Sequence, residues 1–338
     1  MESKRKEAAL RSWTQRLPIE MSQMDEGKPP LFAWGILFVA LIAVSSAGIV
    51  LQSMSEVPPL LRASWRMQGT ALVLLPGFIY QYSRMAAGSV TSKDWSIMLL
   101  SSIFLGAHFG SWVWSLDHTS LVHSLLFVSI HPIVLVLLMP LMGIAVRRGH
   151  ILGVSIGLAG ALLSLGDIDS GGEVTMAGDA AAFLGAATVV GYLLAGRHLR
   201  SERQTPIFVY AFPVTLGAGI WLAMAAISQE GASISDTIPE HSLFGWSDAV
   251  WLSWIAYLSI GPGLMGHTGI NTVLRWIAPI TVSIVLLFEP VVGGIIGWLW
   301  EGEITLGMWT LLGGPLMLAG AIIVTMEEYS SGVVTDTD

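Results

Sequence analysis

The chain has 338 residues, of which 53% are hydrophobic and 12% are charged, and its formal net charge is −8. The charged share is about half of the ~25% typical of soluble domains, and the mean hydropathy is +0.68. This composition excludes an ordinary cytosolic enzyme and a disordered chain, and the negative charge argues against nucleic acid as a partner. The absence of cysteine excludes disulfides, thiolate zinc sites and a cysteine nucleophile. The composition therefore indicates a polytopic membrane protein.

The first 30 residues are polar and contain six lysines and arginines. They lack the apolar stretch and small-residue cleavage site of a secretory signal. Leu10, Trp13 and Leu17 recur at helical spacing among charged residues. Two interpretations stay open, a solvated tail and a short helix lying on the membrane surface.

Ten hydrophobic segments follow, and most have the ~20 residues that a transmembrane helix needs. The first five lie near residues 31–52, 58–80, 95–116, 121–146 and 151–165. The second five lie near residues 176–199, 206–227, 246–271, 279–300 and 306–326. The predicted fold class is therefore an all-α polytopic membrane protein with ten transmembrane helices.

Lysine and arginine residues set the predicted orientation. If the N-terminus is cytoplasmic, 14 of the 16 lie in cytoplasmic segments, whereas the outward loops carry acidic residues and no basic ones. The remaining two, Arg62 and Arg66, lie within the second segment. Because basic residues accumulate on the cytoplasmic side, both tails, 1–30 and 327–338, are predicted to be cytoplasmic.

The two halves of the chain repeat one another. Three stretches of the first half align with three of the second at offsets of 158 to 160 residues: Leu105–Gly110 with Leu264–Gly269, Phe127–Pro132 with Val285–Pro290, and Leu158–Ala161 with Leu318–Ala321. Five spans in each half is an odd number, so the second half enters the membrane in the opposite orientation. The sequence thus predicts two inverted five-helix repeats, 31–165 and 176–326, an arrangement typical of secondary transporters.

These halves, each with a helix interrupted by proline and closed by an Ala- and Gly-rich helix, resemble the EamA-type transporters of the drug/metabolite transporter superfamily. The resemblance covers roughly residues 31–326. Its most specific motifs are Gly178-Asp179, Phe288-Glu289-Pro290-Val291-Val292, Glu301-Gly302-Glu303, Gly313-Gly314 and Leu318-Ala319-Gly320. The resemblance implies a ten-helix bundle that transports a metabolite through a central cavity, and it implies no single substrate. The first half departs from the family pattern at His131 and at Arg147-Arg148.

Two titratable residues precede prolines near the middle of predicted spans. Glu289 precedes Pro290 in the ninth segment, and His131 precedes Pro132 at the equivalent place in the fourth. A charge at the bilayer centre costs ~2.5–3.5 kcal/mol on insertion scales, so Glu289 must face the bundle interior. Glu289 would either exchange protons or bind a cation, or else pin a neighbouring helix as a neutral acid. His131 would either tune that acid, since imidazole titrates near neutral pH, or bond a carbonyl freed by Pro132.

A second symmetric pair, His108 and His267, lies mid-span beside small residues in the third and eighth segments. Small neighbours allow close helix packing or leave room for a ligand, and both interpretations stay open. The histidine spacing does not resemble a known set of metal ligands.

Arg62 and Arg66 are one helical turn apart and share a face of the second segment. Arg62 is expected to snorkel to the outer surface. Arg66 is deeper, and it matches an arginine of the resembled family's second helix. It would bind a substrate carboxylate or pair with Glu289, or else pair with an outer acid such as Asp117 or Glu56.

The sequence favours a secondary transporter, and not an enzyme, that moves a small organic solute by alternating access. Proton coupling is a secondary hypothesis. The expected partners are the solute, the lipid bilayer and protons, with no cofactor and no nucleic acid; the plasma membrane is the expected location and an organelle membrane the alternative. An exchanger of phosphorylated solutes or nucleotide sugars would need several cations in the cavity, and the second half offers only Arg275. A further alternative is a membrane sensor or scaffold that does not transport.

Overall fold

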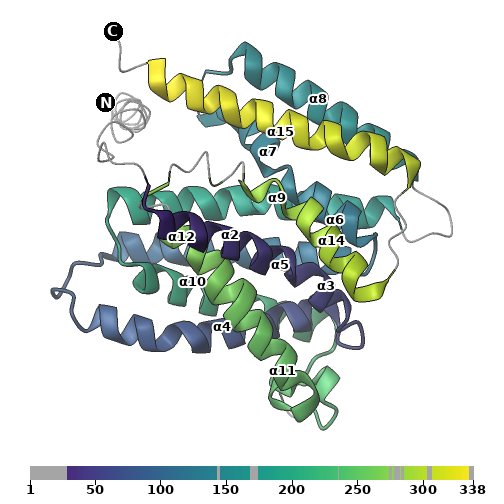
Figure 1. The fold of residues 1–338 in the computed structure, drawn as a ribbon. Helices are drawn as coiled ribbons and strands as arrows, with labels where there is room; N and C mark the ends of the chain where they lie inside the picture. The colour runs from purple at the N-terminus through teal and green to yellow at the C-terminus, as the bar shows by residue number, and fades with distance from the viewer. Residues whose placement is uncertain are drawn as a thin grey trace.

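The computed structural model describes residues 29–142, 145–167, 174–234, 236–273, 276–277, 282, 285–302 and 307–334. These residues form a bundle of helices (Figure 1). The fold is thus all-α, as predicted, over the described ranges. Nearly all of the N-terminal tail, the end of the C-terminal tail and Arg275 lie outside them.

The helices of the first half follow the order of the predicted segments. They are α2 (Leu31–Ser45), α3 (Ala47–Gln52), α4 (Pro59–Tyr82), α5 (Ser92–Leu116), α6 (Leu121–Ser129), α7 (His131–Leu138), the 3₁₀ turn η1 (Met139–Met142), α8 (Arg148–Ser164) and the 3₁₀ turn η2 (Leu165–Asp167).

The second half has the same general order, with two π-helical stretches. It comprises α9 (Met176–Arg197), the π-helix η3 (His198–Glu202), α10 (Ile207–Gln229), the 3₁₀ turns η4 (Pro239–His241) and η5 (Gly245–Ser247), α11 (Ala249–Leu258), the π-helix η6 (Ser259–Thr268), α12 (Gly269–Val273), α14 (Glu289–Glu301) and α15 (Met308–Val334).

Eight stretches of the described chain are long and apolar enough to cross a membrane, and they coincide with eight of the ten predicted segments. They are Leu31–Gln52, Ser92–Leu116, Leu121–Leu141, Arg148–Asp167, Met176–Arg200, Ile207–Gln229, Ala249–Val273 and Met308–Glu327. The fifth predicted segment proves longer than expected, at 20 residues, because its helix begins at Arg148. The chain is a multi-pass membrane protein.

The other two predicted segments fall on α4 and α14. α4 has 24 residues, enough to span a bilayer at 1.5 Å per residue. Its two arginines, Arg62 and Arg66, keep its apolarity low. α14 has only 13 residues, and much of the chain immediately before it lies outside the described residues.

Several spans are interrupted where the sequence places proline. The fourth predicted span divides at Ile130 into α6 and α7, and Pro132 lies in the first turn of α7. In the same way α14 begins at Glu289, directly before Pro290. Proline has no N–H to donate to the preceding turn, so a helix restarts there at little cost. The eighth span contains η6 with Pro262 inside it, and π-helical segments recur at functional sites.

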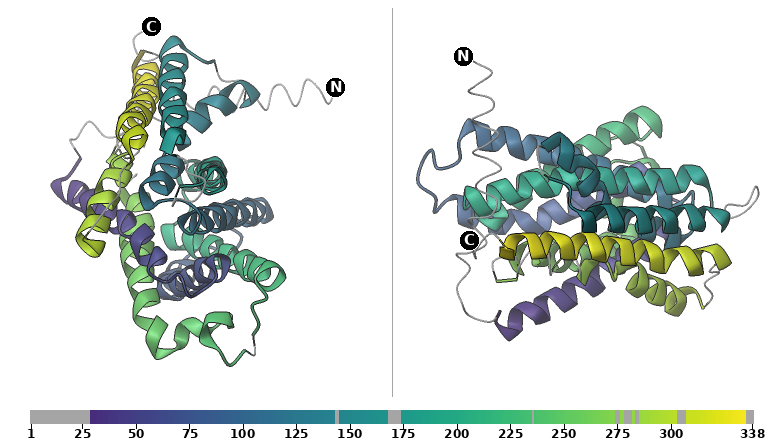
Figure 2. Two further views of the ribbon diagram at one scale, coloured as in Figure 1. Left: turned by 90° about the vertical axis from the view of Figure 1, so that its right-hand side faces the viewer. Right: turned by 90° about the horizontal axis from the view of Figure 1, so that it is seen from above.

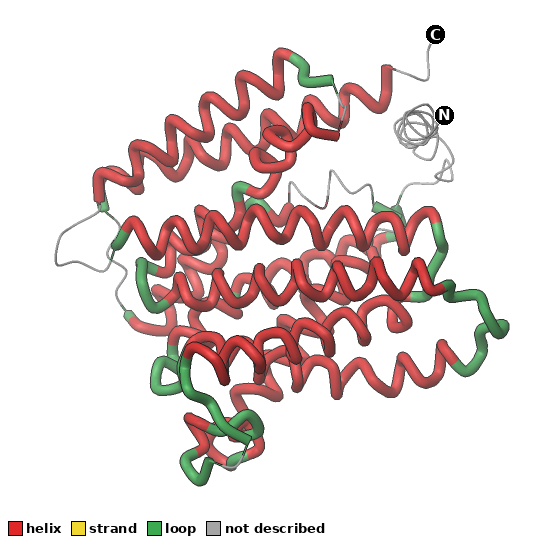
Figure 3. Tube along the Cα trace, turned by 180° about the vertical axis from the view of Figure 1, so that it is seen from behind, coloured by secondary structure: helices red, strands yellow, loops and turns green. Residues whose placement is uncertain are grey.

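Helices of the two halves pack against each other throughout the bundle. α4 contacts α10 and η6, α5 contacts α9 and α10, α6 contacts α9 and α14, and α2 contacts η6 and α14. The largest buried cluster includes Trp65, Phe109 and Trp112. α8 and α15 lie side by side along one edge (Figure 2). The view from behind shows only helices and their connections among the drawn elements (Figure 3).

Glycine allows α8 and α15 to touch backbone to backbone. A Cβ atom on Gly153 would lie 2.7 Å from the carbonyl oxygen of Gly320, and one on Gly160 would lie 2.6 Å from that of Gly313. No side chain fits at such distances, so these positions require glycine. The Gly153-x-x-x-Gly157 motif therefore serves helix packing between the halves.

The first described helix, α2, begins at the same end of the bundle at which the last helix, α15, ends (Figures 1 and 2). The connection from α4 to α5 also lies at this end (Figure 1). Below, this end is called the inner end, following the predicted orientation, and the opposite end is called the outer end.

Candidate functional site

A buried arginine lies in the interior of the bundle, on α4. Arg66 is 1% exposed. Its guanidinium carbon lies 4.3 Å from the ring centroid of Phe109 and 5.7 Å from that of Trp112, so the cation rests on aromatic rings of α5. Its Nε and Nη1 atoms have no hydrogen-bond partner in the described part of the chain. A buried cation with unused donors is costly unless it binds an anion.

A cavity of about 30 Å³ adjoins Arg66. α4 and α5 of the first half and α9, α10, η6 and α12 of the second half line it. Its volume has room for water and none for an organic solute. Its polar wall consists of hydroxyls, an amide and an imidazole, from Thr70, Tyr192, Thr215, His267, Thr268 and Asn271.

Two tyrosines lie between the cavity and the inner end. The Tyr192 hydroxyl hydrogen-bonds the side chains of Asn271 and Tyr210. The Tyr210 hydroxyl lies 2.9 Å from the Ser101 hydroxyl, and the two tyrosine rings stack with centroids 6.3 Å apart. This chain of buried hydroxyls joins α5, α9, α10 and α12 beneath the cavity.

The structure brings His108 and His267 together around Phe109. Their ring centroids lie 4.9 Å and 5.6 Å from that of Phe109, and both imidazoles are within electrostatic range of Arg66. The Nδ1–H of His108 donates to the carbonyl of Gly185 at 2.9 Å, which anchors α5 to α9. His267 lines the cavity, so it is the histidine of this pair that is placed to meet a solute.

Glu289 and His131 each occupy the first position of a half-helix. Glu289 begins α14 and lies within electrostatic range of Arg66, although no ion pair joins the two in the described chain. His131 begins α7, and its ring donates to the carbonyl of Val128, the group that Pro132 leaves without an amide partner. No hydrogen bond or ion pair between Glu289 and His131 is found among the described residues. The negative charge of Glu289 is favoured at a helix N-terminus.

The expectation that Arg62 snorkels to the surface is wrong. Arg62 is 0% exposed and forms an ion pair with Asp117 at the end of α5. Its partner, which is 22% exposed, lets the guanidinium remain inside.

The Glu230 carboxylate, which follows α10, accepts hydrogen bonds from the backbone amides of Leu60 and Leu61 at 2.7 and 2.9 Å. Burial raises the pKa of Glu230 above its usual value, opposed by these two donors.

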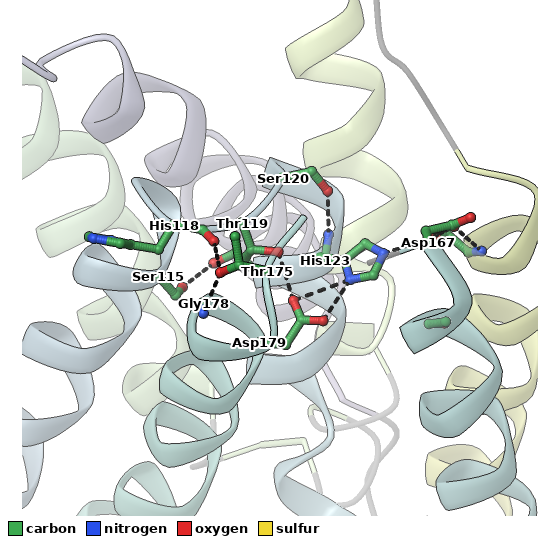
Figure 4. Close-up of polar contacts among 12 residues, drawn as sticks. Ser115, His118, Thr119, Ser120, His123, Asp167, Thr175, Gly178 and Asp179 are labelled. Carbon is green, nitrogen blue, oxygen red and sulfur yellow. Dashed lines mark hydrogen bonds and ion pairs between the residues drawn. The ribbon is translucent and has the colours of Figure 1, made fainter. Parts of the chain in front are cut away.

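A buried polar cluster at the outer end was not predicted (Figure 4). Nδ1 of His123, on α6, lies 3.0 Å from a carboxylate oxygen of Asp179, on α9, and the Thr119 hydroxyl donates to the other oxygen at 2.7 Å. Nε2 of His123 lies 2.6 Å from the Thr310 hydroxyl, which in turn contacts Asp167 at 2.6 Å. The cluster therefore links α6 and η2 of the first half to α9 and α15 of the second.

Only part of this cluster left a signal in the sequence. Asp179 belongs to a motif of the family resemblance, and His123 is a polar residue inside an apolar segment. The contact between His123 and Thr310 joins residues 187 positions apart, and no local pattern predicts it.

At the inner end, one ion pair joins the halves. Arg203, after η3, makes two contacts of 3.0 Å with the carboxylate of Asp94 near the start of α5. Asp94 also accepts the amide and hydroxyl of Thr91, which completes a capping box. Among the described residues, no three histidine or acidic side chains come together in a way that could hold a metal ion.

The first half of the chain, residues 33–166, matches the sequence model of the EamA-like transporter family. This part of the chain is therefore similar to the EamA-like transporters. The matched family is one of membrane transporters. The match includes Arg62, Arg66, His108 and His131 of the predicted site residues, whereas His267 and Glu289 come from the other half.

Two further comparisons concern the sequence and the fold of the chain. No curated protein was found to match its sequence. Its structure is similar to a solved chain described as "Crystal structure of protein", with a TM-score of 0.57 and 18% sequence identity. The likeness covers 87% of this chain and 96% of that one. At this identity, the likeness concerns the fold alone.

Proposed function

We propose that this protein is a secondary transporter that moves a small organic solute by alternating access through the cavity beside Arg66. The lining of that cavity carries the proposal, because both halves of the chain contribute helices to it. A site between two halves opens to each side of the membrane in turn when the halves rock against each other.

The proposal includes two inverted five-helix repeats, 31–165 and 176–326. The helix contacts support it, because exchanging the halves exchanges the contacts. The contact of α5 with α9 becomes that of η6 with α2, and the contact of α5 with α10 becomes that of η6 with α4. The contact of α7 with α9 becomes that of α14 with α2, and each of these contacts is present. The stretches Ser92–Leu116 and Ala249–Val273, which would be equivalent, have 25 residues each.

Polar contacts between the halves at both ends support an alternating mechanism. At the outer end, Glu230 binds the start of α4, and the His123 cluster joins α6 to α9 and α15. At the inner end, Arg203 pairs with Asp94. With both sets in place the cavity has room only for water, so a solute would enter from either side after that side's contacts separate.

Proton coupling through Glu289 and His131 remains the secondary part of the proposal. Both residues stand at repeat-equivalent starts of half-helices, and interrupted helices are where transporters place ion and substrate sites. Glu289 would act through Arg66, which lies within its electrostatic range. His131, already bonded to Val128, would have the smaller effect.

The alternatives have less support. A phosphorylated-solute or nucleotide-sugar exchanger would need several cations in the cavity, and Arg66 is the only lysine or arginine among its lining residues. A non-transporting sensor or scaffold would not need a cavity shared between the halves. A plasma-membrane location belongs to the proposal, and microscopy of a tagged chain tests it against an organelle membrane.

Flux into liposomes tests the transport proposal. Thr215 lines the cavity from α10, and the next residue, Leu216, is 39% exposed on the outside of the bundle. Thr215→Leu should therefore obstruct solute exchange, whereas Leu216→Phe should leave it unchanged. Melting curves and size-exclusion profiles check that both variants fold. Equal flux of folded protein in the two variants, or no flux of any solute in the wild type, would refute transport through this cavity.

A further inference from the structure

We propose that the transported solute is a small organic anion whose carboxylate is bound by Arg66. This inference rests on the proposed transport function and adds the chemical class of the substrate. Its starting point is the pair of guanidinium nitrogens of Arg66, Nε and Nη1, that are buried and without a partner in the described residues.

Three acids at the outer end of the bundle are already engaged. Asp117 pairs with Arg62, Asp179 binds His123 and Thr119, and Glu230 binds two backbone amides of α4. Arg62, one turn away on the same helix, also has Nε and Nη1 without a partner among the described residues, but its Nη2 pairs with the carboxylate of Asp117, and no carboxylate pairs with Arg66 there. An incoming carboxylate would form an ion pair with Arg66, as Asp117 does with Arg62.

Among the described residues, the acid that acts electrostatically on Arg66 is Glu289. It forms no ion pair with Arg66 in the described chain, and it does not line the cavity. It therefore acts on Arg66 without occupying the donors Nε and Nη1 of that cation. The cavity side of Arg66 therefore stays available to a ligand.

The surroundings of Arg66 favour a carboxylate over a phosphate. The Phe109 ring lies 4.3 Å from the guanidinium carbon and restricts the movement of the cation. A guanidinium presents its donors in one plane, which suits the planar carboxylate group. A doubly charged phosphate would need further cations, and the remaining cavity wall offers neutral donors instead, including Thr70, Thr215 and Asn271.

The rest of the wall limits the body of the anion. Leu74, Leu105 and Val214 provide apolar surface, and the hydroxyls and the amide provide hydrogen bonds. A short carbon chain with a carboxylate at one end and a hydroxyl, keto or amino group matches this mixture. Because the cavity measures about 30 Å³ in this state, such a solute enters only as the helices move apart.

Matched acid and amide probes test the inference. We would measure the melting temperature of the purified protein with formate, acetate and lactate, each compared with formamide, acetamide and lactamide at equal ionic strength. Each pair is nearly equal in shape and differs in charge. The acids should raise the melting temperature with saturation, because a ligand that binds the folded state stabilises it. The amides should not.

Variants locate the effect. Arg66→Gln should abolish the response to the acids, and Arg66→Lys should retain a weaker response, because lysine keeps the charge without the planar fork. Arg84→Gln is the matched control: Arg84 is an exposed cation just beyond the inner end of α4, stacked on Tyr80, and its loss should change nothing. If Arg66→Gln does not fold, the comparison of acids with amides in the wild type and in Arg66→Lys still shows whether Arg66 binds the carboxylate.

Several results would overturn the anion site. They are equal stabilisation by acids and amides, no stabilisation by any acid, and an undiminished acid response in Arg66→Gln. Liposome flux separates this failure from failure of the transport proposal. Thr215-dependent flux of neutral solutes with no acid binding would reject the anion site and keep transport. Acid binding that depends on Arg66, without flux of any acid, would reject transport and keep the site.

Discussion

Replacing Asp179 by asparagine is expected to destabilise the folded protein substantially. Asp179 is 2% exposed, accepts a hydrogen bond from Thr119 at 2.7 Å and lies 3.0 Å from Nδ1 of His123. Removing one member of a buried, hydrogen-bonded group that includes a charge typically costs about 3–5 kcal/mol. Asparagine keeps the size and one acceptor oxygen, which recovers roughly 1 kcal/mol. We therefore expect Asp179→Asn to lower the free energy of unfolding by about 2–4 kcal/mol.

The measurement is denaturant unfolding in detergent micelles, followed by tryptophan fluorescence. Glu56→Gln is the control, because Glu56 is an exposed acid in the connection between α3 and α4 at the outer end. Its loss should stay within about 0.5 kcal/mol of the wild type.

A double-mutant cycle tests whether the cluster acts as one unit. Thr310→Val removes the hydroxyl that lies between His123 and Asp167. Combined with Asp179→Asn, it should cost less than the sum of the single variants, with a coupling of about 0.5–3 kcal/mol. If Asp179→Asn is as stable as Glu56→Gln, or if the two changes add independently, His123 does not transmit a contact between the halves and the reasoning fails.

Four further outcomes are expected. Arg66→Ala should reduce flux per folded protein at least about tenfold more than Arg62→Ala, and equal activities would remove Arg66 from the site. Glu289→Gln should abolish flux driven by a pH gradient while leaving the melting curve unchanged, with a milder loss in His131→Ala; a wild-type pH profile in Glu289→Gln would end its coupling role. Epitope tags on both termini should resist protease added to intact cells, and cleavage of either would overturn the topology. Because the pKa of Glu230 is raised in the folded state, stability should fall as pH rises above about 4.5, and Glu230→Gln should flatten that slope in pH-dependent unfolding.

Apolar segments predicted most of the helices, because a bilayer imposes length and composition on each span. The second segment shows the limit of this argument. Arg62 and Arg66 lower its apolarity, yet α4 forms over 24 residues because both cations are covered, one by Asp117 and the other by aromatic rings. The break between α6 and α7 was encoded locally by Pro132.

The candidate site was partly predictable for a different reason. The alignment of the halves singled out His108 and His267, and the structure places both against Phe109. The partner of Arg62 could not be read from the sequence, because pairing with Asp117 depends on how α4 and α5 lie side by side. His123 escaped notice since its partners come from helices distant along the chain.

The glycine contacts of α8 and α15 have the reciprocity of a dimer interface. Gly153 faces Gly320 and Gly160 faces Gly313. At the offset of 160 residues that aligns these helices, Gly313 corresponds to Gly153 and Gly320 to Gly160. Each glycine thus meets the counterpart of the other, as residues do across a two-fold axis between identical subunits. Within one polypeptide, α8 and α15 reproduce the contact that two copies of one helix would make across such an axis.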